Sequence, residues 1–295
     1  MPQPSRSATG RSDLPAPPPL RPPVGRSLAA AFVCTVIWLG AAAPFARPAC
    51  GQSPPAKPAA GPDALALVEK IGARIASYPK LESWQARASS TTSRMTSDWK
   101  PKGTTVTEKI VTVNGGLWSE EILSATETED GKTRDVTRKA QEEARDRAAQ
   151  QKRSTDEERK SDQRSRGRRS LDMTRDEVLP FGPEKRGGYD FTVEGAADLD
   201  GSPAFVLRSR SRVRSDEKLE GLYYVDPETG DVRRAELTLA KKPGPLKRME
   251  MEVDFRILPE GYQVMTKAVM RIHVGLVVKN IRVEAIETYS EHQIR

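Results

Sequence analysis

The chain has 295 residues, with 48 Lys and Arg against 41 Asp and Glu, a length that allows one large or two small domains. The formal net charge of +7 arises from two segments, because residues 1–57 and residues 130–170 each contribute +5 and the remainder is slightly acidic. We therefore expect no nucleic-acid partner, since nucleic-acid binding needs basic residues gathered on a folded face.

Residues 1–51 have the pattern of a secretory signal peptide. A basic start precedes an apolar stretch, Leu28–Ala43, and the small residues Ala49 and Gly51 occupy the two positions that define a cleavage site. This pattern predicts a periplasmic protein whose mature chain begins at Gln52.

The two cysteines agree with this interpretation, because Cys34 and Cys50 both precede the expected cleavage and a disulfide framework is excluded. Two alternatives remain open. Residues 28–46 could stay attached as a membrane anchor, although this stretch is near the lower length limit for a span. Lipid attachment at Cys50 is the second alternative, although the residues before it match a lipoprotein signal poorly.

A Pro/Ala linker at residues 52–62 separates the leader from a single domain predicted at residues 63–295. The domain begins with an amphipathic helix at residues 63–78, with Asp63 as its N-cap and Pro79 ending it. Apolar residues recur along this helix at steps of three and four residues. They are Leu65, Val68, Ile71, Ile75 and Tyr78.

Most of the remaining domain has the alternating pattern of antiparallel strands joined by short turns. "TTVTEKIVTV" and "LWSEEILSATET" flank the hairpin signal Asn114-Gly115-Gly116, and "YYVDPETGDVRRAELTL" is a second hairpin. About ten strands are expected, and the lack of alternating strands and helices excludes a doubly wound parallel sheet.

Residues 130–170 interrupt the strands with a charged insert. Its sequence contains good helix formers but no apolar stripe, so we expect a solvated helix at its start and disorder near Ser165–Arg169.

The clearest strand is "RMEMEVDFRI", in which apolar and charged residues alternate without exception. One face of the sheet should therefore be apolar and the other charged. The predicted fold class is α+β, mainly β: a strongly curved antiparallel half-barrel wrapped around helix 63–78. The apolar face is either ordinary core or the lining of an acyl-chain site, which its flexible methionines would suit. The candidate lining residues are Leu237, Leu239, Met249, Met251, Phe255 and Met270.

Enzymatic signals are weak. The mature chain would keep two histidines, His273 and His292, without a second His or Cys at ligand spacing, so neither a metal nor another cofactor is expected. No cysteine nucleophile and no Gly-x-Ser-x-Gly turn is present. A hydrolase acting on envelope polymers therefore ranks last among the functions considered.

Alternating arginines follow residue 207, and they indicate either a contact for anionic lipid head groups or acidic partners, or a solvated edge strand. They are Arg208, Arg210, Arg212 and Arg214.

The helix ending in "ARIASYPKLESWQARAS", the run of antiparallel strands and the turns in "YYVDPETGDVRRAEL" and "ILPEGYQV" resemble the LolA/LolB-like superfamily of periplasmic lipoprotein carriers and outer membrane lipoprotein-sorting proteins. The resemblance covers about residues 63–129 and 171–295, whereas the charged insert departs from it. It implies a half-open curved sheet whose concave face is closed by helices and holds acyl chains. No family residue can be matched to a position in this chain.

Two functions follow as expectations. The first is an exported, non-enzymatic carrier that holds a lipid or lipoprotein acyl chain and contacts the membrane peripherally. The second is a periplasmic sensor or interaction module on the same fold, with the charged insert binding an envelope protein.

Overall fold

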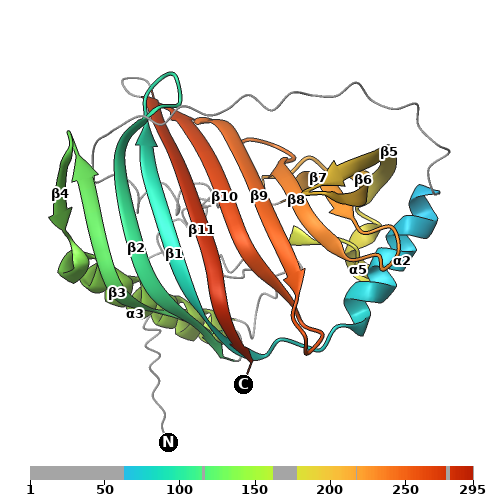
Figure 1. Cartoon of the computed structure of the whole chain (residues 1–295), viewed down its shortest axis with the longest axis horizontal. Coiled ribbons are helices and arrows are strands. Elements are labelled where there is room, and N and C mark those ends of the chain that lie inside the picture. The colour runs from blue at the N-terminus through green and yellow to red at the C-terminus, as the bar shows by residue number, and fades with distance from the viewer. Residues whose placement is uncertain (1–62, 115–116, 162–177, 217, 277–279, 295) are drawn as a thin grey trace, which may run out of the picture.

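The computed structural model describes residues 63–114, 117–161, 178–216, 218–276 and 280–294. In this part of the chain, eleven antiparallel strands form one curved sheet (Figure 1). The strand order is β4-β3-β2-β1-β11-β10-β9-β8-β7-β6-β5, with β4 and β5 as open edges. The predicted half-barrel of antiparallel strands is confirmed. The expected leader and linker lie outside the described residues.

In this sheet, neighbouring strands are also consecutive in the chain, except that β11 pairs with β1 on one side while it pairs with β10 on the other. Within the described ranges, three helices accompany the strands. The elements, in chain order, are α2 (Ala64–Ser77), β1 (Ser83–Met95), β2 (Pro101–Asn114), β3 (Leu117–Glu129), β4 (Lys132–Asp135), α3 (Thr137–Ser161), α5 (Pro183–Arg186), β5 (Tyr189–Leu199), β6 (Ser202–Ser211), β7 (Leu219–Val225), β8 (Val232–Leu239), β9 (Leu246–Ile257), β10 (Gln263–Gly275) and β11 (Asn280–Ile294).

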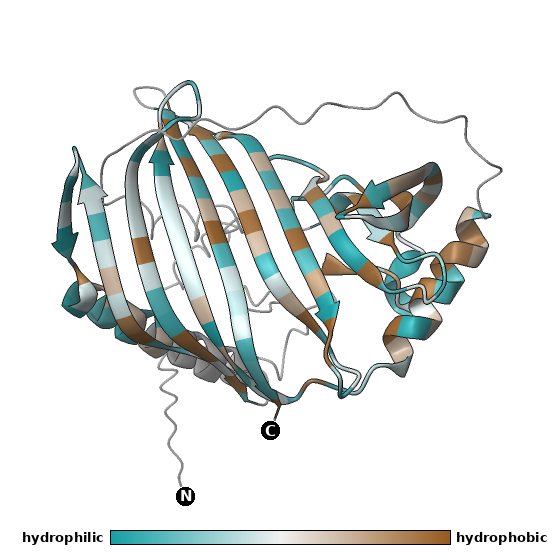
Figure 2. Cartoon of the chain, viewed as in Figure 1, coloured by the Kyte–Doolittle hydropathy of each residue, from teal (hydrophilic) through white to brown (hydrophobic). Residues whose placement is uncertain are grey.

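The two faces of the sheet differ in polarity, as the alternating bands along the strands show (Figure 2). Met251, Met270 and Ala285 are paired across β9, β10 and β11 and therefore share a face, which we call the inner face. The outer face carries ion pairs between neighbouring strands. Examples are Arg234 with Asp254 at 2.5 Å and Arg271 with Glu284 at 2.6 Å.

Helix α2 packs against the inner face of β6–β9 and forms the main hydrophobic core there. The carboxylate of Asp63 accepts hydrogen bonds from the backbone N–H groups of Leu65 and Ala66, which confirms the predicted N-cap. The predicted stripe was wrong at one position, because Leu65 is 62% exposed whereas Leu67 is 4% exposed. Leu67 lies four residues before Ile71 and therefore on the buried side of the helix.

The segment after the undescribed residues 162–177 also belongs to this core. Residues 178–181 are buried. The Phe181 ring lies 4.9 Å from that of Tyr223 and 5.5 Å from that of Phe191. The Tyr223 hydroxyl donates to the carbonyl of Val178 at 3.1 Å. The core is therefore covered by α2 and by this segment together.

The beginning of the charged insert is part of the sheet, which corrects the expectation of a purely solvated helix. Strand β4 pairs with β3, and Ala140 and Ala144 of α3 pack against Ile122 and Ala125 of β3. Alanine is small enough for a largely polar helix to lie close to a strand. The residues predicted to be disordered near Ser165 lie outside the described part.

Helix α3 also satisfies backbone groups along β3. The Gln141 amide donates to the carbonyl of Ile122 at 3.1 Å, and the Thr137 hydroxyl accepts from the N–H of Ala125 at 2.9 Å. Backbone groups of β3 that the short strand β4 does not reach are therefore hydrogen-bonded by side chains of α3.

Candidate functional site

All six predicted lining residues lie on the inner face of β8, β9 and β10, but they differ in exposure. Leu237, Leu239 and Met251 are buried within the core beneath α2. The other three are half-buried and pack against the margin of that core. They are Met249, Phe255 and Met270.

The apolar surface continues beyond these residues toward the middle of the sheet. Met265 and Ile272 on β10 and Ile281 on β11 also pack against the core while remaining half-buried. Met249, Met265 and Met270 therefore place three flexible side chains at the margin of the core, and methionine adapts to irregular apolar shapes.

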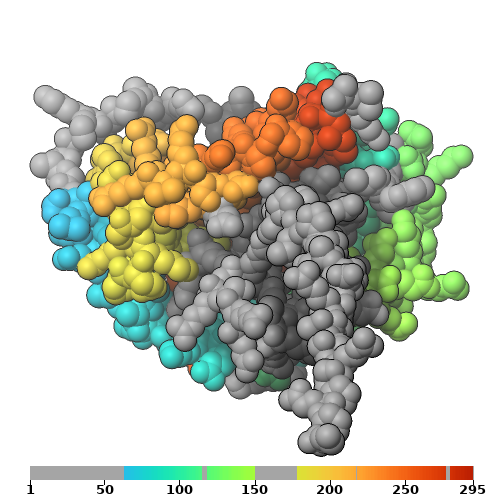
Figure 3. All heavy atoms as spheres, turned by 180° about the vertical axis from the view of Figure 1, so that it is seen from behind, coloured from blue at the N-terminus to red at the C-terminus, as the bar shows by residue number. Residues whose placement is uncertain are grey.

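Small side chains occupy the middle of the inner face, between the core at α2 and the cluster at α3. Register pairing places them on β1, β10 and β11. They are Ala86, Ala88, Ser90, Ala268 and Ala285. The two helix-covered ends lie on opposite sides of the molecule, with the α2 end in blue and yellow and the β3–β4 end in green (Figure 3).

A row of alternating charges crosses this middle region. From α3 toward β10 its members are Arg147, Glu120, Lys109 and Glu287, which we call the charged row. The ammonium of Lys109 contacts both carboxylates, with Glu287 at 2.6 Å, and Arg147 lies 2.9 Å from the second oxygen of Glu120. The Lys109 Nζ also lies 5.7 Å from the centre of the Trp118 ring.

Burial and neighbouring charges shift the pKa of Lys109, within the charged row, and of Tyr289 beside it. Burial alone would lower the pKa of Lys109, but the carboxylates of Glu287 and Glu120 outweigh it and raise the pKa. Burial, followed by the charge of Glu287, raises the pKa of Tyr289, so its hydroxyl stays protonated beside that carboxylate. Counted by residue type, the row contains two positive and two negative side chains.

Sequence reasoning missed the charged row. The available signal was the phase of "TEKIVTV", in which Lys109 shares a face with the apolar Val111. The partners of Lys109 could not be read from the sequence, because Glu120 and Glu287 come from β3 and from the distant strand β11.

His292 lies near the C-terminal end of β11 and is half-buried. The centre of its ring lies 6.2 Å from that of Trp84. Burial lowers the pKa of His292, and its Nε2 lies 3.1 Å from the carbonyl oxygen of Met265. Within the described ranges, no group of three His, Cys, Asp or Glu side chains could hold a metal ion.

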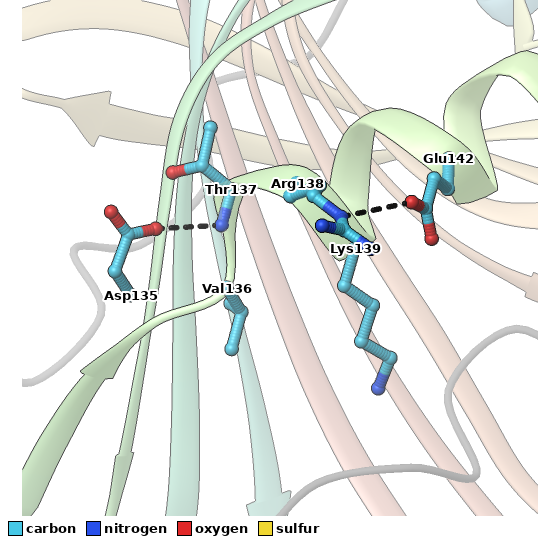
Figure 4. Close-up of a pocket in the computed structure, with 6 residues that line it drawn as sticks. All are labelled: Asp135, Val136, Thr137, Arg138, Lys139 and Glu142. Carbon is cyan, nitrogen blue, oxygen red and sulfur yellow. Dashed lines mark hydrogen bonds and ion pairs between the residues drawn. The ribbon is translucent and has the colours of Figure 1, made fainter.

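A polar hollow of about 550 Å³ lies where α3 begins (Figure 4). Three of its charged groups have partners within the hollow: Asp135 accepts from the backbone N–H of Thr137 at 2.8 Å, and Arg138 pairs with Glu142 at 3.2 Å. These contacts are typical of a capped, solvated helix start.

Two of the predicted alternating arginines are paired across the edge of the sheet. Arg208 binds Glu194 at 2.5 Å and Arg212 binds Asp190 at 2.8 Å, and both acids belong to the edge strand β5. This pairing favours the interpretation of a solvated edge. None of the helices in the described ranges has the length and apolar composition that crossing a membrane requires.

No family model matches the chain, and no curated protein matches its sequence. Among solved structures, it is similar to a LolA superfamily protein from Nitrosomonas europaea (13% identity, 80% of this chain and 94% of that chain covered, TM-score 0.35). An outer membrane lipoprotein-sorting protein domain from Vibrio parahaemolyticus is also similar (10% identity, 79% and 94% covered, TM-score 0.37). So is the MucA/MucB complex of Pseudomonas aeruginosa (12% identity, 79% and 99% covered, TM-score 0.24).

The first two structures carry the family description that the sequence resemblance suggested. At these identities and TM-scores no residue of the site is transferred from them, and the function is argued from the chain's own residues.

Proposed function

We propose that this chain is an exported, non-enzymatic binding protein that holds the acyl chain of a lipid or lipoprotein against the inner face of its sheet. The observation that carries the proposal is the margin of the core. There, Met249, Phe255 and Met270 remain half-buried beside the small side chains of the middle strands. Each methylene group transferred from water to such a surface contributes about 0.8 kcal/mol, so one acyl chain needs no covalent attachment.

The six candidate residues would then have two roles. Leu237, Leu239 and Met251, which are buried, would form the rigid base of the site. Met249, Phe255 and Met270 would contact the acyl chain and adjust to its shape.

Native mass spectrometry of the gently purified protein tests the proposal first. We expect a co-purifying lipid mass that disappears after organic extraction. Titration of the extracted protein with laurate analogues then measures binding directly. Failure of every acyl compound to bind would overturn the proposal.

A matched pair of variants locates the site. Met270→Gln places an amide on the inner face and should weaken acyl binding by roughly three- to tenfold, as expected when apolar contact is lost at a binding surface. Thr288→Gln introduces the same amide on the outer face of β11 and should leave binding unchanged, because Thr288 is exposed there. Equal effects of both variants would place the site elsewhere.

The second candidate function is a protein-interaction module that uses α3. Its support is the charged, exposed side of this helix, where Arg138 pairs with Glu142 and Lys139 with Glu143 one turn apart. Deleting residues 130–170 is a poor test, because the deletion would uncover Ile122 and Ala125 on β3. Exchanging the charges in Arg138→Glu with Glu142→Arg keeps the pair and inverts the pattern. An interaction module should lose its partner in a pull-down, whereas acyl binding should remain.

A further inference from the structure

The charged row ends beside the proposed acyl site. Along β11, Glu287 is the next inner-face residue after Ala285, which is opposite Met270. Glu287 is opposite Ala268, and Ala268 is opposite Val253 on β9. Glu287 and Val253 are thus two strands apart, a backbone separation of about 10 Å.

Glu287 is also the member of the row that a ligand at this site can reach. Its side chain is 25% exposed, compared with 9% for Lys109 and 5% for Glu120, and Arg147, which is 37% exposed, lies at the far end of the row. The ammonium of Lys109 is already shared between the two carboxylates, and Arg147 binds Glu120 at the far end of the row. A polar group arriving from the acyl site therefore meets a carboxylate first.

The charges of the row cancel, so no positive charge is left over for an anionic ligand. A carboxylate or phosphate next to Glu287 would add a second negative charge in a half-buried region, which is unfavourable. A hydroxyl or amide N–H would instead gain a charge-assisted hydrogen bond to the exposed part of the Glu287 carboxylate.

We infer that the acyl compound bound here carries a neutral hydrogen-bond donor, a hydroxyl or an amide N–H, at its head, and that Glu287 accepts this bond. Glu287 is then the residue that determines specificity among acyl ligands, by attraction of donors and by repulsion of anions. This inference rests on the proposed acyl site and adds the chemical class of the head group.

Three twelve-carbon probes separate these effects: lauramide, which has amide N–H donors, N,N-dimethyllauramide, which lacks them, and laurate, which is anionic. Dissociation constants are measured by isothermal titration calorimetry at pH 7.5. For the unaltered protein we expect lauramide to bind about tenfold more tightly than dimethyllauramide, because one hydrogen bond to a charged acceptor changes the dissociation constant by about that factor. Laurate should bind more weakly than lauramide by at least the same factor.

Glu287→Gln removes the negative charge and keeps the shape of the side chain. The preference for lauramide over laurate should then fall below about threefold, mainly because laurate binds more tightly. Glu284→Gln is the matched control, since it lies on the outer face of the same strand and pairs with Arg271 there. It should leave all three constants unchanged. Circular dichroism verifies the fold of both variants, and the three probes decide the question on the unaltered protein if Glu287→Gln does not fold.

Equal binding of the three probes overturns the inference and leaves the proposed function standing. Tighter binding of laurate than of lauramide also overturns it, and so does a preference that Glu287→Gln does not change. If none of the probes binds, the proposed function and the inference fail together.

Discussion

The Nε of Arg74 donates to an Oδ1 of Asp231 at 2.6 Å and thereby joins the last turn of α2 to the turn between β7 and β8. One helical turn earlier, the ammonium of Lys70 donates to two carbonyls of the same connection, Pro227 at 2.9 Å and Glu228 at 2.7 Å. The hairpin between β7 and β8 therefore sets the position of the helix that covers the core.

Asp231→Asn tests this connection. Burial alone would raise the pKa of Asp231, but hydrogen bonds from Arg74 and Tyr78 outweigh it and hold the pKa below its ordinary value. Because the pKa of Asp231 is lower in the folded protein than in the unfolded chain, the interaction stabilises the fold above about pH 4. This stabilisation is lost as the pH falls through the pKa of Asp231 in the folded state. We expect the variant to lower the free energy of unfolding by about 1–2 kcal/mol at pH 7. Urea denaturation at pH 7 and pH 2.5 checks this, and an equal difference at both pH values would contradict it.

Two leucines on α2 provide a matched test of its buried side. Leu67→Ala should cost about 2–4 kcal/mol of unfolding free energy, since a 4% exposed side chain is removed from the core. Leu65→Ala should change it by less than about 0.5 kcal/mol, because Leu65 is 62% exposed. Chemical denaturation of both variants measures the two values. The reverse order would mean that α2 is rotated relative to the sheet.

Gly72 should resist a change that usually stabilises a helix. Alanine is normally favoured over glycine by about 1 kcal/mol inside a helix. A Cβ at residue 72, however, would lie 2.9 Å from the backbone carbonyl oxygen of Phe181. We expect Gly72→Ala to lower the midpoint of thermal unfolding. Ala73→Gly, on the exposed side of the same helix, serves as the control and should show only the ordinary propensity loss of about 1 kcal/mol. A stabilised Gly72→Ala would show that this contact relaxes freely.

Lys109→Met tests whether the charged row stabilises the fold. The substitution removes the cation that Glu120 and Glu287 share, while Arg147 still pairs with Glu120, and it should cost about 3–5 kcal/mol at pH 7. In the unaltered protein the pKa of Lys109 is raised above its ordinary value of 10.5. The stabilisation that Lys109 provides is therefore complete below pH 10.5 and is lost as the pH rises through the pKa of Lys109 in the folded state. Denaturation curves from pH 7 to pH 12 measure this alkaline loss, and a cost of the substitution that does not change over this range would contradict it.

Local patterns were sufficient to predict α2, its N-cap, the hairpins and the two faces of β9, because each depends on residues close together in the chain. The packing of α3 was missed since two alanines give little signal in a charged sequence, although they suffice against β3. The charged row was missed for a different reason. Its contacts depend on the register of β11, which lies far from β2 and β3 in the chain.

The position of β11 also constrains how this protein can be made. Strand β11, Asn280–Ile294, lies inside the sheet and joins β1–β4 to β5–β10. A ribosome must therefore synthesise the chain through residue 294 before the sheet can be completed, and contacts over such sequence separations slow folding. Loss of residues 280–294 to a premature stop codon or a protease would not remove an edge strand but would divide the sheet into two separate pieces.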